Sequence, residues 1–146
     1  YLDLIQGKVE GQPRIDLDLE IRTQAMCREA IENELVASGH DVSDGGVACA
    51  ITESAIIGNI GAAITEAPGD RWDAAMFGET QSRIMLSVKN ENLSAIEALA
   101  AAQNVPMVVI GTVGGDAITF GGDDITVPLK DVSDSWKNGF NRATSD

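Results

Sequence analysis

The spacing of apolar residues along the chain predicts a series of helices. In most of the stretches below, apolar side chains recur every three or four positions, which is the period of one helix face. The predicted helices cover about residues 18–37, 45–58, 72–77 and 93–100, followed by a closing helix in which Val132, Trp136 and Phe140 fall four apart. Ser38 and Gly39 are expected to end the first helix, with Gly39 as its C-cap.

Short apolar runs between these helices predict strands at 60–65, 84–88, 105–113, 117–120 and 125–127. The run over 105–113 is almost continuously apolar, which is typical of a strand covered on both faces. The last two runs are separated by glycines and aspartates and predict a hairpin. This order favours an α/β fold, an α+β sandwich in which helices pack on a mixed β-sheet.

Glycine and proline mark the expected boundaries. Residues 1–15 combine a short apolar patch with Gly7, Gly11 and Pro13, and we interpret them as a connector from a preceding domain. Residues 16–146 are then predicted to form a single α/β domain, and 67–70 a turn within it. Because the chain opens on Tyr1 rather than Met, we expect it to be a fragment of a longer polypeptide.

Composition and charge narrow the classes of partner. The chain has 146 residues with a net charge of −13, and the negative electrostatic field of such a chain repels nucleic-acid backbones and anionic lipid surfaces. No apolar run reaches the roughly 20 residues that cross a bilayer. The two cysteines, Cys27 and Cys49, have no metal-type spacing and are predicted to be small core residues in a reducing compartment. From the negative charge and the short apolar runs we expect neither a nucleic-acid nor a membrane partner.

The first polar motif runs from His40 to Gly46 and leads into the second predicted helix. Ser43 and Asp44 are good N-cap residues, and a helix start offers unpaired N–H groups to an anion. Gly45 and Gly46 leave room for a phosphate or for another backbone. The same pattern also fits an ordinary tight turn. His40, the one histidine, is expected to be a structural hydrogen-bonding residue beside Asp41 rather than a catalytic one.

The second polar cluster, residues 77–83, immediately precedes the predicted strand at 84–88. Arg83 has two interpretations: it grips a phosphate or carboxylate, or it pairs with Glu79 to hold its own loop. Asp41, Asp44 and Glu79 are only weak candidates for Mg²⁺ bound through a phosphate. Phosphate-binding loops ending in Gly-Lys-Ser/Thr and complete catalytic constellations are not present in the sequence. We predict no catalytic residue and no self-contained metal site.

Two motifs in fixed order, H-D-V-S-D-G-G-V-A-x-A-I-x-E and F-G-E-T-Q-S-R, resemble a known family. The chain is similar to the carboxy-terminal domain of the aminoimidazole ribonucleotide synthetase superfamily. Within it, the resemblance is to the last domain, in the second repeat, of small-subunit-type phosphoribosylformylglycinamidine synthases. The resemblance implies a nucleotide or phosphate cleft in which the second repeat holds a structural nucleotide. The implied cleft residues are Asp41, Ser43, Gly45, Gly46, Glu79, Thr80, Gln81, Ser82 and Arg83.

The resemblance also implies a function for the parent enzyme. Such synthases are cytoplasmic ATP- and Mg²⁺-dependent ligases of purine biosynthesis that convert formylglycinamide ribonucleotide, with glutamine-derived ammonia, to formylglycinamidine ribonucleotide. The implied partners are the amino-terminal domains of the same chain, a glutaminase subunit and a small bridging subunit. For the isolated chain we expect no activity and no tightly bound cofactor, and self-association into a homodimer. Two alternatives stay open: a purely structural or dimerisation module, and the equivalent domain of a selenophosphate synthase or thiamine-phosphate kinase relative.

Overall fold

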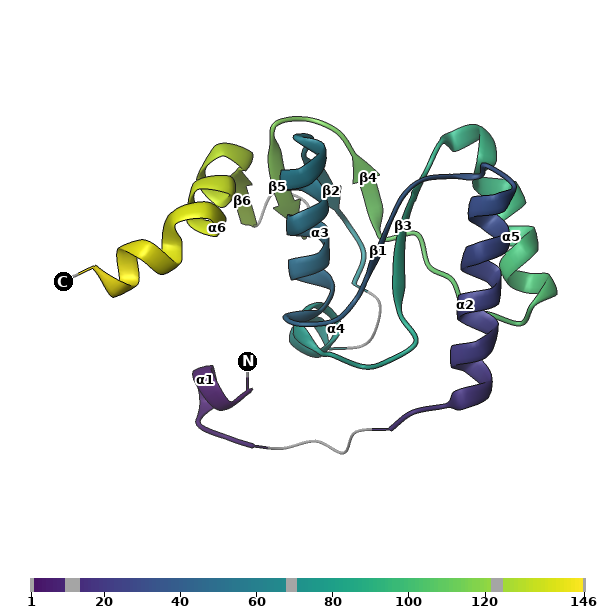
Figure 1. Ribbon diagram of the computed structural model, residues 1–146, viewed down its shortest axis with the longest axis horizontal. Coiled ribbons are helices and arrows are strands. Elements are labelled where there is room, and N and C mark those ends of the chain that lie inside the picture. The colour runs from purple at the N-terminus through teal and green to yellow at the C-terminus, as the bar shows by residue number, and fades with distance from the viewer. Residues whose placement is uncertain (1, 10–13, 68–70, 122–124, 146) are drawn as a thin grey trace.

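Helices and strands alternate along most of the chain in the computed structural model, which describes residues 2–9, 14–67, 71–121 and 125–145 (Figure 1). The elements are α1 (Leu2–Gln6), α2 (Leu17–Glu32), β1 (Val36–Asp41), α3 (Gly46–Gly58), β2 (Ala62–Ile64), α4 (Trp72–Phe77), β3 (Ile84–Val88), a 3₁₀ turn (Asn90–Asn92), α5 (Leu93–Ala102), β4 (Gly111–Val113), β5 (Ala117–Phe120), β6 (Ile125–Pro128) and α6 (Leu129–Thr144). The predicted α/β class is confirmed.

A four-stranded mixed sheet has the strand order β4-β2-β5-β6. The β2–β5 pair is parallel, and the β2–β4 and β5–β6 pairs are antiparallel, which confirms both the mixed sheet and the predicted hairpin. In the register, Ala62 and Ile118 are partners, and Ile118 also pairs with Val127. These residues therefore lie on one face of the sheet, where Ala62 and Ile118 enter the core.

Strands β1 and β3 form a separate antiparallel ribbon, with Asp41 opposite Ile84 at one end. The helix predicted over 18–37 is confirmed as α2, but its predicted end and its Gly39 cap were wrong. Helix α2 ends at Glu32 because Asn33 returns its N–H to Glu29 and the next residue, Glu34, adopts a left-handed φ of 57°. Residues 36–41 are then free to pair as a strand.

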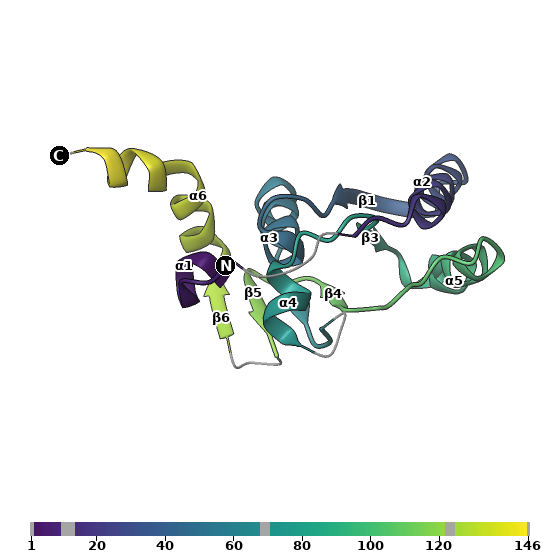
Figure 2. The same cartoon turned by 90° about the horizontal axis from the view of Figure 1, so that it is seen from below.

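The hydrophobic core has two parts. The larger cluster lies between α3 and the mixed sheet and is built from Val47, Ile51, Ala55, Ala62, Ile64, Met76, Ile118 and Leu129. The smaller one joins α2 to α5 through Met26, Ala30, Ile96 and Ala100. In Figures 1 and 2 the β1–β3 ribbon runs between these two regions. The ribbon and the loops at its end therefore connect the α3 region to the α2–α5 pair.

Two burial predictions were wrong. Of the run over 105–113, only Gly111–Val113 pairs as a strand, at the edge of the mixed sheet. Val108 and Val109 are 54% and 48% exposed, so this segment is not covered on both faces within the described chain. Cys49 is exposed and Cys27 half-buried, and burial raises the pKa of both free thiols. Neither cysteine is a core residue.

The two ends of the chain differ. Val9 is 90% exposed, as a connector would be, while the proposed boundary at residue 15 stays a prediction. The closing helix is confirmed as α6, and its carboxyl half extends away from the other elements (Figure 2). The predicted turn over 67–70 falls mostly outside the described residues, as does the turn between β5 and β6. None of the described helices is both long and apolar enough to cross a membrane.

Candidate functional site

The two polar motifs, far apart in the sequence, meet where α3 begins and α4 ends. The backbone N–H of Gly45 donates to Oε1 of Glu79 at 2.9 Å, across 34 positions of sequence. The N–H of Val42 donates to the carbonyl of Arg83 at 3.1 Å, which extends the β1–β3 ribbon by one bond. In Figure 1 the start of α3 lies beside α4. We call this meeting point, residues 41–46 and 78–83, the junction.

Helix α3 is not capped as predicted. Gly45, rather than Ser43 or Asp44, is the N-cap residue, and it has a left-handed φ of 77°. Ser43 contributes its backbone carbonyl, which accepts the N–H of Gly46 at 3.0 Å. The side-chain oxygen at this helix start comes from Glu79, so a carboxylate of the protein itself lies where the helix dipole favours an anion.

Gly46 is required by a close approach of two backbones. A Cβ atom at this position would lie 2.7 Å from the carbonyl oxygen of Met76 and 2.8 Å from that of Gly78. Its φ of 72° also lies in the left-handed region that L side chains rarely adopt. The glycine pair was predicted to leave room for a phosphate or for another backbone. Gly46 leaves room for a backbone, that of the end of α4.

Arg83 binds backbone carbonyls rather than the carboxylate of Glu79. Its Nε donates to Thr80 and its Nη1 to Ala75, both at 3.2 Å, and its Nη2 donates to Gly78. These carbonyls belong to the end of α4 and to the following loop, so the guanidinium acts as a C-terminal cap. Burial lowers the pKa of Arg83, but an arginine stays protonated at neutral pH. Its predicted contact with a ligand stays a prediction.

Ser82 ties the junction to helix α2. Its Oγ donates to Oε2 of Glu20 at 2.6 Å, and Oε1 of Glu20 accepts from Gln24 at the same distance. The Ser82 bond is the largest of the effects that lower the pKa of Glu20. Ser82 also has a left-handed φ of 64°. Sequence reasoning missed Glu20, because the spacing of charges on one helix does not show which loop it will face.

The remaining cleft residues are exposed. Asp41, Ser43, Thr80 and Gln81 present their side chains to solvent around the junction. His40 lies beside them, with Nδ1 2.7 Å from the carbonyl of Asp41 and Nε2 3.4 Å from Oε2 of Glu53. The structural hydrogen bonding predicted for His40 is therefore present. Hydroxyl and amide groups that face solvent beside a fixed turn can hydrogen-bond a sugar or phosphate.

Among the described residues, no three His, Cys, Asp or Glu side chains come together as a metal site would require. An open groove of about 830 Å³ lies away from the junction, where the polar face of α6 meets the β5 strand start. Its lining includes Asn59, Asp116, Lys130, Ser133 and Lys137. Sequence reasoning did not predict this groove, which only the packing of α6 creates.

Comparison with known proteins identifies the fold that builds this junction. Residues 2–123 match the family described as "AIR synthase related protein, C-terminal domain". The chain belongs to this family. The match includes both motifs of the junction and ends before α6.

Curated relatives extend the match along the chain. A phosphoribosylformylglycinamidine synthase subunit PurL from a Synechococcus strain is 45% identical over 120 residues, covering 80% of this chain and 16% of that protein. The PurL subunit of Thermomicrobium roseum is 38% identical over 145 residues, covering 96% of this chain and 20% of that protein. The chain thus spans about a fifth of the length of these relatives.

Solved structures show the same fold. Phosphoribosylformylglycinamidine synthase II from Thermotoga maritima matches with a TM-score of 0.71 and 22% identity, over 83% of this chain and 22% of that one. T. maritima PurL complexed with ATP matches with a TM-score of 0.65 and 22% identity, over 77% and 21% of the two chains. At this level of identity the likeness concerns the fold, and it confirms the predicted family architecture.

Proposed function

We propose that this chain is the carboxy-terminal domain of a phosphoribosylformylglycinamidine synthase, a carbon–nitrogen ligase of purine biosynthesis. The parent enzyme would use ATP to convert formylglycinamide ribonucleotide and ammonia to formylglycinamidine ribonucleotide. The family match and the PurL relatives at 38–45% identity support this assignment. T. maritima PurL, which has the same fold, is known in complexes with FGAR and with ATP.

The observation that carries a role for the domain is the junction itself. Gly45 and Glu79 bring the two motifs together at 2.9 Å, and Gly46 fixes them against the end of α4. We assign two tasks to the cleft residues. Gly45, Gly46, Glu79, Ser82 and Arg83 hold the shape, because their described contacts are with the protein. The exposed side chains Asp41, Ser43, Thr80 and Gln81 contact the nucleotide or its phosphates.

The residues present fit part of a nucleotide site. Two hydroxyls and an amide suit a ribose or a phosphate, whereas the α3 start is already filled by the carboxylate of Glu79. ATP, with Mg²⁺ on its phosphates, would therefore be held mainly by residues outside this chain. ATP, when bound, supplies the activated phosphoryl group of the ligase reaction. This chain contributes one wall of the cleft, and we expect no tight nucleotide binding by the chain alone.

Partners follow from the same assignment. We propose that the domain contacts the amino-terminal part of its own polypeptide, a glutaminase subunit and a small bridging subunit in the cytoplasm. A solved T. maritima structure described as PurLQS contains a chain of this fold, with a TM-score of 0.70, and supports an assembly of this kind. The net charge of −13 disfavours contact with anionic lipid surfaces.

Nucleotide retention tests the cleft. In the full-length parent enzyme, the double variant Thr80→Ala, Gln81→Ala should lose roughly tenfold or more in nucleotide affinity, about 1.4 kcal/mol, with an unchanged melting temperature. Thr112→Ala is the matched control, because Thr112 is also exposed but lies on the sheet-edge strand β4. Unchanged retention in the double variant would refute the cleft assignment. The isolated chain should form no amidine product, and turnover above background would contradict its role as a partial site.

A purely structural module is the second candidate. The contacts of Arg83 favour it, since its three described hydrogen bonds all go to backbone carbonyls. This alternative predicts that Arg83→Ala lowers the melting temperature and leaves nucleotide retention unchanged, and that the Thr80, Gln81 double variant also retains nucleotide. The cleft hypothesis expects the same result for Arg83→Ala, but it expects the Thr80, Gln81 double variant to lose nucleotide.

A further inference from the structure

One edge of the mixed sheet is open to solvent, along the segment that leads from α5 into β4. Strand β4 is the edge strand in the order β4-β2-β5-β6. Along this segment Met107, Val108, Val109 and Val113 are between 40% and 58% exposed. Figure 2 shows the run from α5 to β4 at the outer rim of the molecule. We call residues 107–113 the open edge.

The backbone of the open edge has hydrogen-bonding groups without partners. On the side that faces β2, the N–H of Gly114 donates to Gly61 at 2.8 Å, and the carbonyl of Ile110 accepts from Thr65 at 3.0 Å. Because every second residue of a strand directs its N–H and C=O groups to the same side, the residues in between direct theirs away from β2. These outward residues are Val109, Gly111 and Val113. In the part of the chain that the structure describes, no hydrogen bond reaches their backbone groups.

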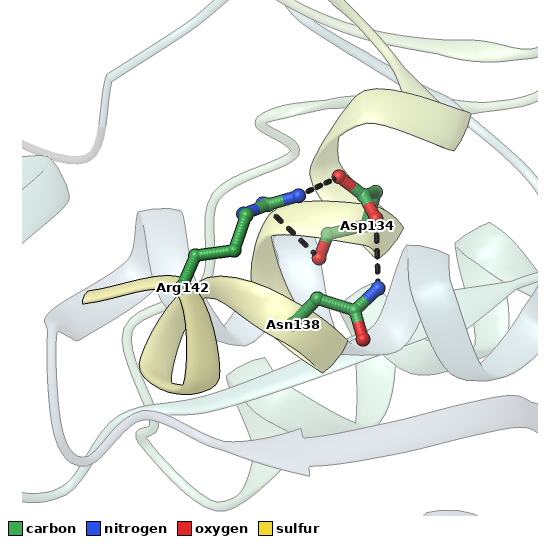
Figure 3. A network of polar contacts seen from close by, with 3 residues as sticks. All are labelled: Asp134, Asn138 and Arg142. Atoms are coloured by element: carbon green, nitrogen blue, oxygen red, sulfur yellow. Dashed lines mark hydrogen bonds and ion pairs between the residues drawn. The ribbon is translucent and has the colours of Figure 1, made fainter. Parts of the chain in front are cut away.

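An open edge specifies its occupant more closely than an exposed helix face does. In the carboxyl half of α6 the backbone groups are paired within the helix. Its polar side chains also bond one another, since Asn138 and Arg142 both donate to the carboxylate of Asp134 (Figure 3). Such a helix accepts any apolar partner. A row of unpaired N–H and C=O groups is completed by one kind of structure, another extended strand.

The side chains of this segment alternate between two faces, as they do in a strand. Val105, Met107 and Val109 lie two positions apart, and they line an open hollow of about 260 Å³ together with Ala100 and Ala101 of α5. An added strand would therefore place every second side chain beside an apolar hollow. Main-chain bonds combined with a pocket for alternate side chains are the means by which sheets bind extended segments.

Charge favours a second copy of this chain as the occupant. The chain has a net charge of −13, so two copies repel each other over most of their surfaces. Residues 98–115 form the longest stretch of the sequence without a charged side chain, and the open edge lies within it. Two copies can thus meet along this edge without like charges opposite each other. A basic peptide, in contrast, would find no carboxylate on the edge itself.

We propose that the open edge is a dimerisation surface on which the same edge of a second copy docks. The two β4 strands pair antiparallel about a two-fold axis at Gly111, which joins the two sheets into one. In this register Val109 of one copy lies opposite Val113 of the other, twice by symmetry, and Gly111 lies opposite Gly111. Each outward residue therefore meets another outward residue, and each such pair exchanges both of its N–H···O bonds.

The pairing is short, so the dimer is weak and reversible. It involves residues 107–113 of each copy, far fewer than the roughly 20–30 residues a side of a standard interface. We expect a dissociation constant between about 10 μM and 1 mM. Because main-chain bonds and apolar contacts hold the copies together, salt should strengthen the association by screening the repulsion between two acidic chains.

Sedimentation equilibrium of this chain, at concentrations up to about 1 mM, tests the proposal. The wild type should show a reversible monomer–dimer equilibrium that tightens with salt. Val109→Lys should weaken it by at least about tenfold, because the ammonium group would lose water beside Val113 of the second copy. Ile57→Lys is the matched control, since Ile57 on α3 is 76% exposed and the substitution changes the net charge equally.

Three results of this experiment would contradict the proposal. A wild type that stays monomeric would leave the edge to a strand of another polypeptide. Association that weakens with salt would mean that opposite charges hold the copies together. Equal effects of Val109→Lys and Ile57→Lys would place the contact elsewhere, provided that both variants melt at the same temperature.

Amide hydrogen exchange locates the contact without any substitution. The N–H groups of Gly111 and Val113 should exchange rapidly in the dilute chain and more slowly as the fraction of dimer rises. Thr112, the register partner of Ala63 in β2, should be protected at every concentration. Protection of Gly111 and Val113 already in the monomer would show that another segment of the same chain covers the edge, and would overturn the proposal. Rapid exchange of both in the dimer would overturn it as well.

Two double variants test the register. Val109→Glu with Val113→Lys places opposite charges across both contacts of the proposed dimer, whereas Val109→Lys with Val113→Lys places like charges there. The first double variant should associate about fivefold or more tightly than the second, although its net charge is more negative. Equal association of the two, or tighter association of the second, would overturn the proposed pairing.

Discussion

The junction and helix α6 are stabilised in different ways. At the junction, hydrogen bonds join residues 34 and 62 positions apart, and a glycine is enclosed by backbone atoms of another element. Along the exposed half of α6, the described side-chain bonds join residues three to eight positions apart. The junction therefore depends on the tertiary fold, whereas that half of α6 depends on its own helix and presents its surface outward. Substitutions of the same chemical type should have unequal effects at the two places.

Glycine substitution should give the largest difference. Gly46→Ala places a Cβ 2.7 Å from the Met76 carbonyl and imposes a left-handed φ, so we expect a loss of unfolding free energy above about 3 kcal/mol. Gly139→Ala in α6 meets no atom within 4 Å and should be neutral or stabilise by up to about 1 kcal/mol. Urea unfolding measures both values.

Gly115→Ala separates strain from collision in that experiment. Gly115 has a φ of 75°, close to the 72° of Gly46, but a Cβ there has nothing within 4 Å. Gly115→Ala should lower the unfolding free energy by only about 1–2 kcal/mol, which is the cost of holding a residue with a Cβ at a left-handed φ. Equal losses for Gly46→Ala and Gly115→Ala would show that the approach of α4 does not require a glycine.

Arginine truncation should give the next largest difference. Arg83→Ala removes three hydrogen bonds to carbonyls at the end of α4 and its loop, and should cost about 2 kcal/mol. Arg142→Ala removes a pair whose side chains are more than half exposed and should cost about 0–1 kcal/mol. Thermal unfolding compares the two. Similar losses of stability for Arg83→Ala and Arg142→Ala would show that the contacts of Arg83 with α4 and its loop stabilise the fold no more than a pair within one helix does.

Removing the carboxylate at the start of α3 should have a smaller effect. Glu79→Ala leaves the N–H of Gly45 without its acceptor and should cost about 1 kcal/mol, as for the loss of a helix cap. Glu79→Gln keeps an acceptor oxygen but removes the charge, so its loss relative to the wild type measures the effect of the charge at the helix dipole, and the further loss in Glu79→Ala measures the effect of the acceptor. Asp134→Ala in α6 should cost less than Glu79→Ala, because the partners of Asp134 lie on its own exposed helix. A loss for Glu79→Ala as small as that for Asp134→Ala would contradict the capping role.

Much of the fold could be predicted from the sequence, because apolar periodicity reports directly on burial. The helices α3, α4, α5 and α6, and the hairpin β5–β6, follow from local spacing. Strand β1 could not be predicted, because Val36-Ala37-Ser38-Gly39-His40-Asp41 has no clear alternation and becomes a strand only through pairing with β3. The exposed run over 107–109 has an apolar pattern typical of burial, and no local signal indicates whether a covering element is present.

The candidate site was predicted as a set of residues but not as a set of contacts. The resemblance implied that the two motifs share one cleft; the bond from Gly45 to Glu79 places them in contact, and their binding of a ligand stays a prediction. The partner of Arg83 was not predicted, since carboxylates are numerous in the sequence whereas the carbonyls of a helix end become available only when α4 stops at Phe77. The contact with Glu20 lies 62 positions away from Ser82 and has no sequence signal.

Acidification should give the smallest effect and distinguishes the same two regions. The pKa of Glu20 lies below its ordinary value of 4.5, chiefly because of the hydrogen bond from Ser82, and that of Asp134 lies below 3.8, chiefly because of Arg142. A carboxylate whose pKa is lowered in the folded state contributes stability that is fully present above its unfolded pKa and disappears as the pH falls through the folded value. The contribution of Glu20 should thus start to decline below pH 4.5 and that of Asp134 below pH 3.8.

In urea unfolding across this range, Glu20→Gln should flatten the dependence of global stability on pH, because its bond joins α2 to the junction. Asp134→Asn should leave the global transition unchanged and alter only the helical signal of α6, because its partners lie on the same helix. If both variants changed the global transition equally, α6 would be part of the cooperative core, and the contrast between the two regions would fail.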